Sequence, residues 1–276
     1  TLFCLAFTFA QQEASYWYFG QNAGLRFNAG NGTVTAITDG QINTLEGCTS
    51  ISDTTGNLLF YTDGRTVWNQ NHQIMTNGDY FGGTGLLGDP SSTSSGLIVP
   101  KPQDPTQYYI FTVDEPHQLN AGAFPNQYTG TYQGGTTAPE ADDGFNNGFA
   151  YSLVDITLDG GLGDVVDTEK NIPLITYDIT NPLEEAYKCS EKITAVKADD
   201  CSSFWVITHF VDKFYAFKVD TAGVNTTPVV STVGPEVPIS GYRRNALGYL
   251  KASPDGSKLA VAHFGFATVE GGNAAG

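Results

Sequence analysis

The stretch Gly248-Tyr-Leu-Lys-Ala-Ser-Pro-Asp-Gly-Ser-Lys-Leu-Ala-Val261 reads as an apolar strand, a tight polar turn and a second apolar strand. Its Pro-Asp-Gly turn has a physical basis, because Pro254 presets φ and Gly256 accepts a positive φ. Three other stretches, 48–61, 96–111 and 193–207, share this design, with a more aromatic second strand. A unit that recurs four times predicts a repeat architecture.

The spacing of the repeats indicates the fold. The turn aspartates are Asp53, Asp104, Asp199 and Asp255, at intervals of roughly 50 to 60 residues once a long insertion at 115–148 is set aside. Units of roughly 40 to 50 residues built from four strands are typical of propeller blades. We therefore predict an all-β fold, a β-propeller of four-stranded antiparallel blades of the WD40 or YVTN type.

Further strands complete these units. The alternation of apolar residues in Lys213–Asp220 is that of a half-buried strand. The other strands expected outside the four units are 17–19, 24–27, 33–37, 66–75, 149–158, 164–166 and 228–233. No segment of ten or more residues shows helical periodicity, so we expect no long helix.

The composition agrees with a β protein and excludes some classes of binding partner. The 276 residues include 32 Gly, 17 Phe and 14 Tyr but only 15% charged residues, which suits a loop-rich β fold. The formal net charge of -16 repels phosphate backbones and anionic lipid, so we expect neither nucleic-acid binding nor membrane insertion. The scattered acids fit a solvated surface, and cation binding is the alternative.

The first ten residues are apolar and are followed at once by polar sequence. Thr8 and Ala10 are small residues at the two positions that a signal peptidase requires before Gln11. We interpret residues 1–10 as the remnant of a secretory signal peptide, with an apolar first strand as the alternative. Residues 11–276 are then one propeller domain, truncated within its last visible blade, and the ring in this fragment is incomplete.

The cysteines allow one disulfide. Cys48, Cys189 and Cys201 remain after the signal, and an exported protein permits disulfides. A local bridge between Cys189 and Cys201 is one interpretation, and buried thiols are the other. With no C-x-x-C pair and no close histidine, we predict no metal site and no cofactor.

The propeller prediction places particular residues on one face. Starts of first strands and ends of second strands meet there, opposite the aspartate turns, and polar groups near an axial opening are a candidate binding site. The candidates for this ligand-binding face are Glu46, Asp63, Arg65, Asp114, Glu191, His209, Arg243, Arg244 and His263. The alternative is that these residues only satisfy loop backbone.

The 115–148 insertion contributes aromatic candidates, while catalytic motifs are missing. Phe124, Tyr128, Tyr132 and Phe145 could stack on sugar rings or on a protein partner, or pack the loop onto the blade. There is no G-x-S-x-G nucleophile turn, and no carboxylate spacing selects a glycosidase pair, so we assign no catalytic residue.

Several segments carry a family resemblance. They include Trp17-Tyr-Phe-Gly-Gln-Asn-Ala-Gly-Leu25, Phe60-Tyr-Thr-Asp-Gly-Arg-Thr-Val-Trp-Asn-Gln-Asn-His72 and Glu191-Lys-Ile-Thr-Ala-Val-Lys197. The chain resembles the N-terminal propeller-like region of large secreted Bacteroidetes surface proteins. Those proteins often carry PKD-like repeats and a gliding-motility-associated C-terminal (type B) sorting domain for type IX secretion. The resemblance implies an exported protein, secreted or at the cell surface, and implies no reaction.

These observations together predict a function class. We expect a non-enzymatic propeller module that binds an extracellular glycan or protein ligand, as in adhesion. The first alternative is a polysaccharide-active hydrolase or lyase that uses carboxylates of the candidate face. The second is a structural spacer.

Overall fold

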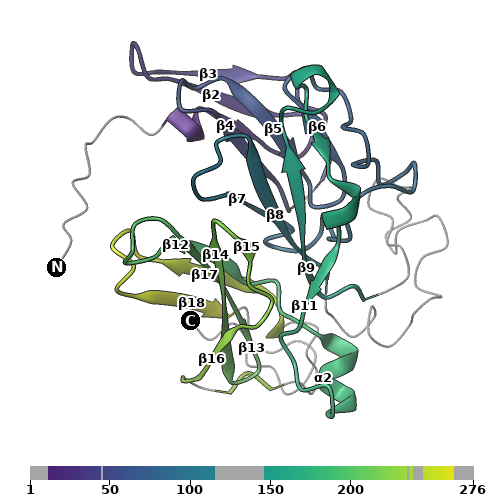
Figure 1. Cartoon of the computed structure of the whole chain (residues 1–276), viewed down its shortest axis with the longest axis vertical. Coiled ribbons are helices and arrows are strands. Elements are labelled where there is room, and N and C mark those ends of the chain that lie inside the picture. The colour runs from purple at the N-terminus through teal and green to yellow at the C-terminus, as the bar shows by residue number, and fades with distance from the viewer. Residues whose placement is uncertain (1–11, 45, 116–145, 235, 239–244, 264–276) are drawn as a thin grey trace.

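The computed structural model describes residues 12–44, 46–115, 146–234, 236–238 and 245–263 (Figure 1). In this part of the chain, antiparallel strands form five sheets that follow one another in sequence order. The only α-helix of the described ranges is α2 (Pro182–Tyr187), whose first turn is capped by Asn181. Three 3-10 turns are η1 (Gln12–Ala14), η2 (Asp159–Gly161) and η3 (Asp167–Glu169). The prediction of an all-β fold is confirmed.

The first two sheets have three strands each, joined by short connections. The first contains β1 (Tyr16–Tyr18), β2 (Gly24–Asn28) and β3 (Thr33–Ile37), and the second contains β4 (Thr49–Ser52), β5 (Leu58–Thr62) and β6 (Val67–Asn69). The expected third strand 66–75 is shorter, because the Asn69 side chain accepts hydrogen bonds from the backbone N–H groups of Asn71 and Gln73 and turns the chain back. A single bridge, Trp68 to Ile74, closes this turn.

The third and fourth sheets repeat one design in which two short strands share an outer edge. The third contains β7 (Gly96–Pro100), β8 (Gln107–Val113) and β9 (Phe149–Asp155), with β10 (Asp164–Val165) and β11 (Ile172–Leu174) both paired to β9. The fourth contains β12 (Ile193–Lys197), β13 (Phe204–Phe210) and β14 (Lys213–Asp220), with β15 (Gly223–Val224) and β16 (Val229–Thr232) both paired to β14. The last sheet pairs β17 (Gly248–Ala252) with β18 (Leu259–His263).

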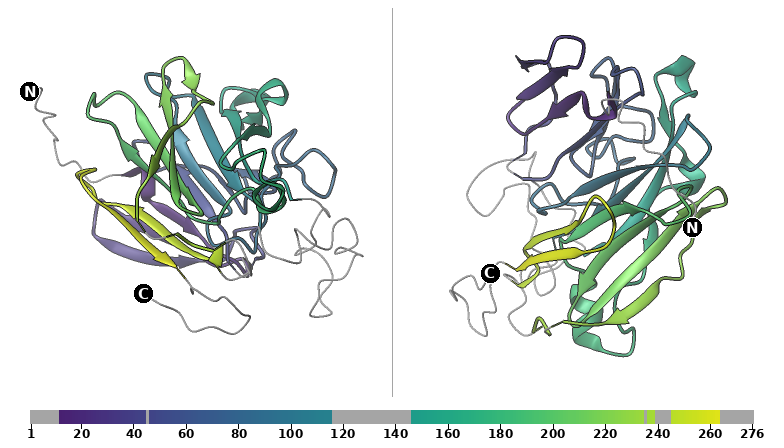
Figure 2. Two further views of the ribbon diagram at one scale, coloured as in Figure 1. Left: turned by 90° about the horizontal axis from the view of Figure 1, so that it is seen from below. Right: turned by 90° about the vertical axis from the view of Figure 1, so that its left-hand side faces the viewer.

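Successive sheets pack face to face, and the second strands explain how. In β8, alternate side chains point to opposite faces of the sheet. Tyr108 and Ile110 join a cluster with Phe60 of the second sheet, while Tyr109 and Phe111 join a cluster that reaches the fourth sheet. Both faces of β8 are therefore buried, which is why this strand is apolar at almost every position. The sheets lie next to one another in the order of the chain (Figures 1 and 2).

The first strands of neighbouring sheets lie side by side, in the order β1, β4, β7, β12 and β17. The first strands of the four repeat units, β4, β7, β12 and β17, are therefore neighbours in chain order. No closed barrel or ring of sheets is found in the described residues. The structure thus establishes the all-β class, while the propeller arrangement with four-stranded blades stays a prediction.

The aspartate turns form as expected, with one correction. Asp53 Oδ1 accepts hydrogen bonds from the N–H and hydroxyl of Thr55, and Asp104 does the same with Thr106. In the third repeat the equivalent residue is Asp200, not Asp199, because Asp200 Oδ1 accepts from the N–H groups of Ser202 and Ser203. Two consecutive aspartates made the position ambiguous, and only the hydrogen bonds decide it.

The structure also settles one cysteine question. Cys189 is free and buried, so the interpretation of a Cys189–Cys201 bridge is wrong, and Cys48 is free as well. The proposed signal remnant at residues 1–10 lies outside the described residues. No helix in the described ranges is long and apolar enough to cross a membrane.

Candidate functional site

The candidate face is built where the first strands start and the second strands end. Its described members fall into separate groups rather than one cluster. Arg243, Arg244, Phe124, Tyr128, Tyr132 and Phe145 lie outside the described residues. The groups differ in whether the polar side-chain atoms already form hydrogen bonds with the surrounding loop backbone.

Glu191 forms the most unusual group. It directly precedes β12 and its side chain is fully buried. Its Oε2 accepts hydrogen bonds from the backbone N–H of Thr93 at 2.8 Å and from the Thr93 hydroxyl at 2.7 Å. Its Oε1 is equally buried and has no hydrogen-bond partner. The contact joins the segments that lead into β7 and β12, so Glu191 links the third and fourth sheets.

The environment of Glu191 disfavours its charge. Burial raises the pKa of this carboxyl to about 8, the Thr93 hydrogen bonds lower it, and the charges of Glu115 and Glu46 raise it again. Glu46 itself is exposed, and partial desolvation raises its pKa. At neutral pH, Glu191 is therefore mostly protonated and can donate as well as accept a hydrogen bond.

Lys192, the next residue, is fully buried too. Its Nζ donates to the carbonyl oxygens of Asn245 at 2.8 Å and Ala246 at 2.7 Å, which ties β12 to the segment before β17. Burial lowers the pKa of this amine to about 7. Sequence reasoning missed Lys192, although the signal was present. Two charged residues, Glu191 and Lys192, stand immediately before the apolar strand that begins at Ile193.

The structure brings His209 and His263 together. Their imidazole centroids are 5.5 Å apart, and the His209 ring also packs edge-on against Phe214. Burial and the charge of Lys192 lower the pKa of each histidine to about 4. Both rings are thus neutral at physiological pH. The Ser190 hydroxyl donates to the carbonyl oxygen of His209 at 2.5 Å, so this group borders the Glu191 segment.

Asp63 and Arg65 serve a different purpose. Asp63 Oδ1 accepts from the backbone N–H groups of Arg65 at 2.9 Å and Thr66 at 2.7 Å, which shapes the turn after β5. Burial raises the pKa of Asp63, and the Arg65 charge opposes this shift. The Arg65 guanidinium is buried and lies 4.4 Å from the ring centroid of Tyr80.

Asp114 fastens the two ends of the long insertion. Its Oδ1 accepts from the N–H of Glu115 at 2.8 Å and its Oδ2 from the N–H of Asn147 at 2.5 Å. Asp114 is buried, so these bonds are shielded from water. For Asp63 and Asp114 the alternative reading is thus the better description, because their carboxylates hold loop backbone. Glu191 differs, since one of its oxygens is unused.

The described residues hold no group of three or more His, Cys, Asp or Glu side chains that could bind a metal ion. No family model matches this chain, and no curated protein or solved structure matches it significantly. The resemblance to secreted Bacteroidetes surface proteins therefore stays a prediction.

Proposed function

We propose that this chain is a non-enzymatic ligand-binding module of the β-propeller class, carried by an exported protein that is secreted or held at the cell surface. The repeat unit, the neighbouring first strands and the face-to-face packing of successive sheets support the propeller arrangement. The apolar start of the sequence and the family resemblance support export. The ligand site is the face where the sheets meet at Glu191.

The observation that carries ligand binding is the unused Oε1 of Glu191. A buried polar atom without a hydrogen bond costs roughly 1 to 3 kcal/mol, and most such atoms in folded proteins are paired. Because Oε1 is buried, a ligand reaches it only when the surrounding chain opens, and a hydrogen bond to Oε1 then recovers this free energy.

The electrostatics of this site restrict the ligand. Glu46 and Glu115 both act on Glu191, and the whole chain carries a formal net charge of -16. Anionic ligands are repelled by such a surface. Neutral hydroxyl-rich glycans and basic segments of a protein partner are the two ligand classes that fit, and adhesion is the process that either would serve.

One observation favours the enzymatic alternative, a polysaccharide hydrolase or lyase. A carboxyl group whose pKa is raised to about 8 has the protonation state of a general acid at neutral pH. Asp63 and Asp114 are occupied by loop backbone, however, so the described residues offer few carboxylates as its partner. The structural-spacer alternative leaves the unused Glu191 oxygen without a role.

The test uses the purified whole chain on a glycan array and as bait in pull-downs from extracellular protein mixtures. Glu191→Gln is compared with Glu185→Gln, which changes an exposed carboxylate on α2. We expect Glu191→Gln to weaken binding at least tenfold and Glu185→Gln to leave it unchanged. Release of reducing sugar from polysaccharides, lost in Glu191→Gln, would favour the enzyme. Absence of any ligand in both assays would overturn the proposal.

A further inference from the structure

A short turn beside the candidate face presents an aromatic side chain to solvent. Phe81 stands in the connection between β6 and β7, and 59% of its surface is exposed. Its ring meets that of Tyr80 edge to face, with centroids 5.3 Å apart. The next residues, Gly82 and Gly83, are exposed and have no side chain to cover the ring. The ring face is therefore accessible to a partner.

The aromatic pair rests on Arg65 of the candidate face. The buried Arg65 guanidinium lies 4.4 Å from the centroid of Tyr80 and 5.6 Å from that of Phe81. A guanidinium over an aromatic ring is attracted to the electron-rich face of the ring. The backbone joins the same two segments, because the N–H of Leu86 donates to the carbonyl oxygen of Arg65 at 2.7 Å. The turn is thus fixed over Arg65.

Hydrogen bonds within the turn fix its shape. Asp79 Oδ1 accepts from the N–H of Gly82 at 2.9 Å, and the N–H of Thr84 donates to the carbonyl oxygen of Asp79 at 2.8 Å. Gly83 donates to the carbonyl oxygen of Tyr80 and has a φ of 81°, which a residue with a side chain adopts only with strain. The backbone on which Phe81 stands is therefore set before any ligand arrives.

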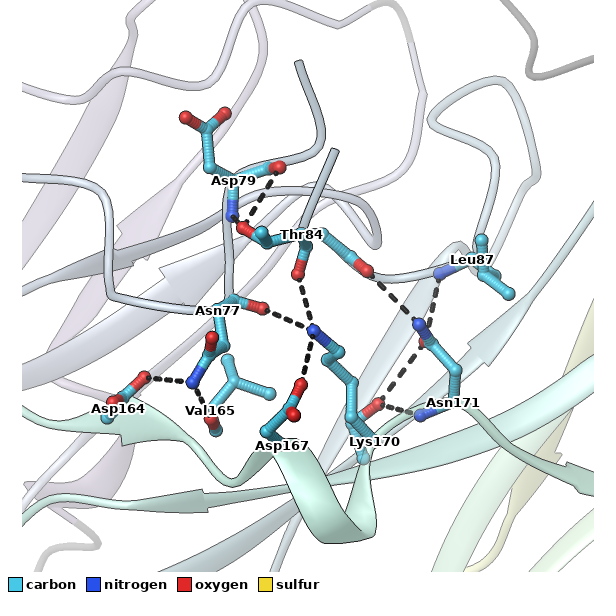
Figure 3. Close-up of polar contacts among 11 residues, drawn as sticks. Asn77, Asp79, Thr84, Leu87, Asp164, Val165, Asp167, Lys170 and Asn171 are labelled. Atoms are coloured by element: carbon cyan, nitrogen blue, oxygen red, sulfur yellow. Dashed lines mark hydrogen bonds and ion pairs between the residues drawn. The ribbon is translucent and has the colours of Figure 1, made fainter. Parts of the chain in front are cut away.

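The segment between η3 and β11 holds the base of this turn (Figure 3). Lys170 Nζ donates to the carbonyl oxygen of Thr84 at 3.0 Å and pairs with Asp167 at 3.2 Å. Asn171 Nδ2 donates to the carbonyl oxygen of Gly85 at 3.1 Å. In Figure 3 the Asp79 carboxylate points away from Lys170 and Asn171, so it takes no part in this anchoring.

The combination has a chemical meaning. Phe81 stays 59% exposed although its turn is held by many contacts, so these contacts present most of the ring to solvent rather than to the core. A rigid ring offers a stacking surface to the apolar face of a sugar, and little conformational entropy is lost on binding. Asp79 Oδ2 lies against Gly82 of the same turn and can accept a hydrogen bond from a sugar hydroxyl.

We propose that Phe81 and Asp79 form a binding platform for a neutral pyranose ring of a glycan. The net charge of -16 disfavours sulfated or uronic sugars at the same place. The inference rests on the proposed function in taking a glycan as the ligand, but it uses residues other than Glu191. It also selects the glycan over the basic protein segment as the partner.

The experiment measures retardation of the whole chain in native gels that contain a neutral glucan, galactan, mannan or xylan, with dextran sulfate as the anionic comparison. The variants are Phe81→Ala, Phe81→Trp and Asp79→Asn. The matched control is Ile179→Ala, because Ile179 is also an exposed apolar side chain, at 68%. Circular dichroism verifies that each variant is folded.

We expect at least one neutral polysaccharide to retard the wild type, Phe81→Ala to weaken that binding at least tenfold, and Phe81→Trp to restore it. Asp79→Asn should weaken binding a fewfold, and Ile179→Ala should have no effect. Three outcomes overturn the platform: no neutral polysaccharide binds, Phe81→Ala binds like the wild type, or only dextran sulfate binds. If Glu191→Gln alone abolishes binding, the platform is wrong and the proposed function stands.

Discussion

The imidazole rings of His209 and His263 lie with their centroids 5.5 Å apart, although the two residues belong to different sheets. His209 is in β13 and His263 ends β18, and the amine of Lys192 acts on both. Three groups that would all be cationic at acid pH thus meet at one junction of the fold, where His209 and Lys192 are buried and His263 is partly buried. This arrangement makes the junction sensitive to acid.

Replacing His209 with Phe should protect the protein against acid. The pKa of His209 is lowered to about 4 from about 6.5 in the unfolded chain. The unfolded state therefore binds more protons between these values, and stability is lost as the pH falls from 6.5 to 4. Between pH 6.5 and pH 4, we expect the free energy of unfolding of His209→Phe to fall by on the order of 2 kcal/mol less than that of the wild type.

Urea unfolding at several pH values between 4 and 7.5 measures this difference. Glu191 has the opposite dependence in the same window, but it is present in both proteins, so the comparison isolates the imidazole. His263→Phe should behave in the same direction. Parallel pH profiles for wild type and His209→Phe would contradict the assigned burial effect.

Glu191→Gln should stabilise the protein at alkaline pH. The pKa of this carboxyl is about 8 in the folded chain and near 4.5 when unfolded. The folded state binds more protons between these values, so stability falls as the pH rises from 4.5 to 8. Gln cannot lose a proton, so the variant escapes this loss. We expect the free energy of unfolding of Glu191→Gln, relative to that of the wild type, to be higher at pH 9 than at pH 5 by on the order of 3 kcal/mol. Guanidinium unfolding midpoints of both proteins at the two pH values measure this gain. The same difference between variant and wild type at pH 5 and at pH 9 would refute it.

Asp114→Ala should loosen both ends of the long insertion. The variant removes the acceptors for the N–H groups of Glu115 and Asn147, and hydrogen bonds to a charged group contribute about 1.5 to 3 kcal/mol each. We expect faster chymotrypsin cleavage at aromatic residues between these ends. Asp255→Ala, in an exposed turn, is the control and should leave the cleavage rate unchanged. Equal rates for both variants would argue against the fastening role.

Lys170→Met should weaken the attachment of the connection between β6 and β7 to the segment before β11. The variant keeps much of the aliphatic side chain but loses the hydrogen bonds to Asn77 and Thr84 and the ion pair with Asp167. We expect a loss of about 2 kcal/mol in urea unfolding, because the amine is mostly shielded from water. Lys258→Met removes an exposed amine and should cost less than 0.5 kcal/mol. Similar losses in the two variants would count against the anchoring role.

Gly64→Ala should be far more damaging than Gly234→Ala. Both glycines have positive φ, 89° and 85°, so both substitutions strain the backbone by about 1 kcal/mol. A Cβ on Gly64 would lie 2.5 Å from the carbonyl oxygen of Ser95, whereas a Cβ on Gly234 meets nothing within 4 Å. We expect Gly64→Ala to lower the free energy of unfolding by about 3 kcal/mol or more. Thermal unfolding measures both, and equal losses would show that Ser95 is not in tight contact.

The sequence alone determined the local elements, because these depend on short-range pattern. The aromatic runs of β8 and β13, the alternation in β14 and the aspartate turns of Asp53 and Asp255 can all be read from residue order. Each of these depends on period-two side-chain direction or on hydrogen bonds within a few residues.

Only the tertiary structure decided which polar groups are available. Asp63, Asp114 and Glu191 look alike in sequence, as acids at strand ends. The N–H groups of the adjacent Glu115 and the distant Asn147 occupy both oxygens of Asp114, whereas one oxygen of Glu191 is unused. The burial of Lys192 and the support of Phe81 by Arg65 likewise depend on segments far apart in the chain. Such contacts arise when sheets pack, and no local pattern encodes them.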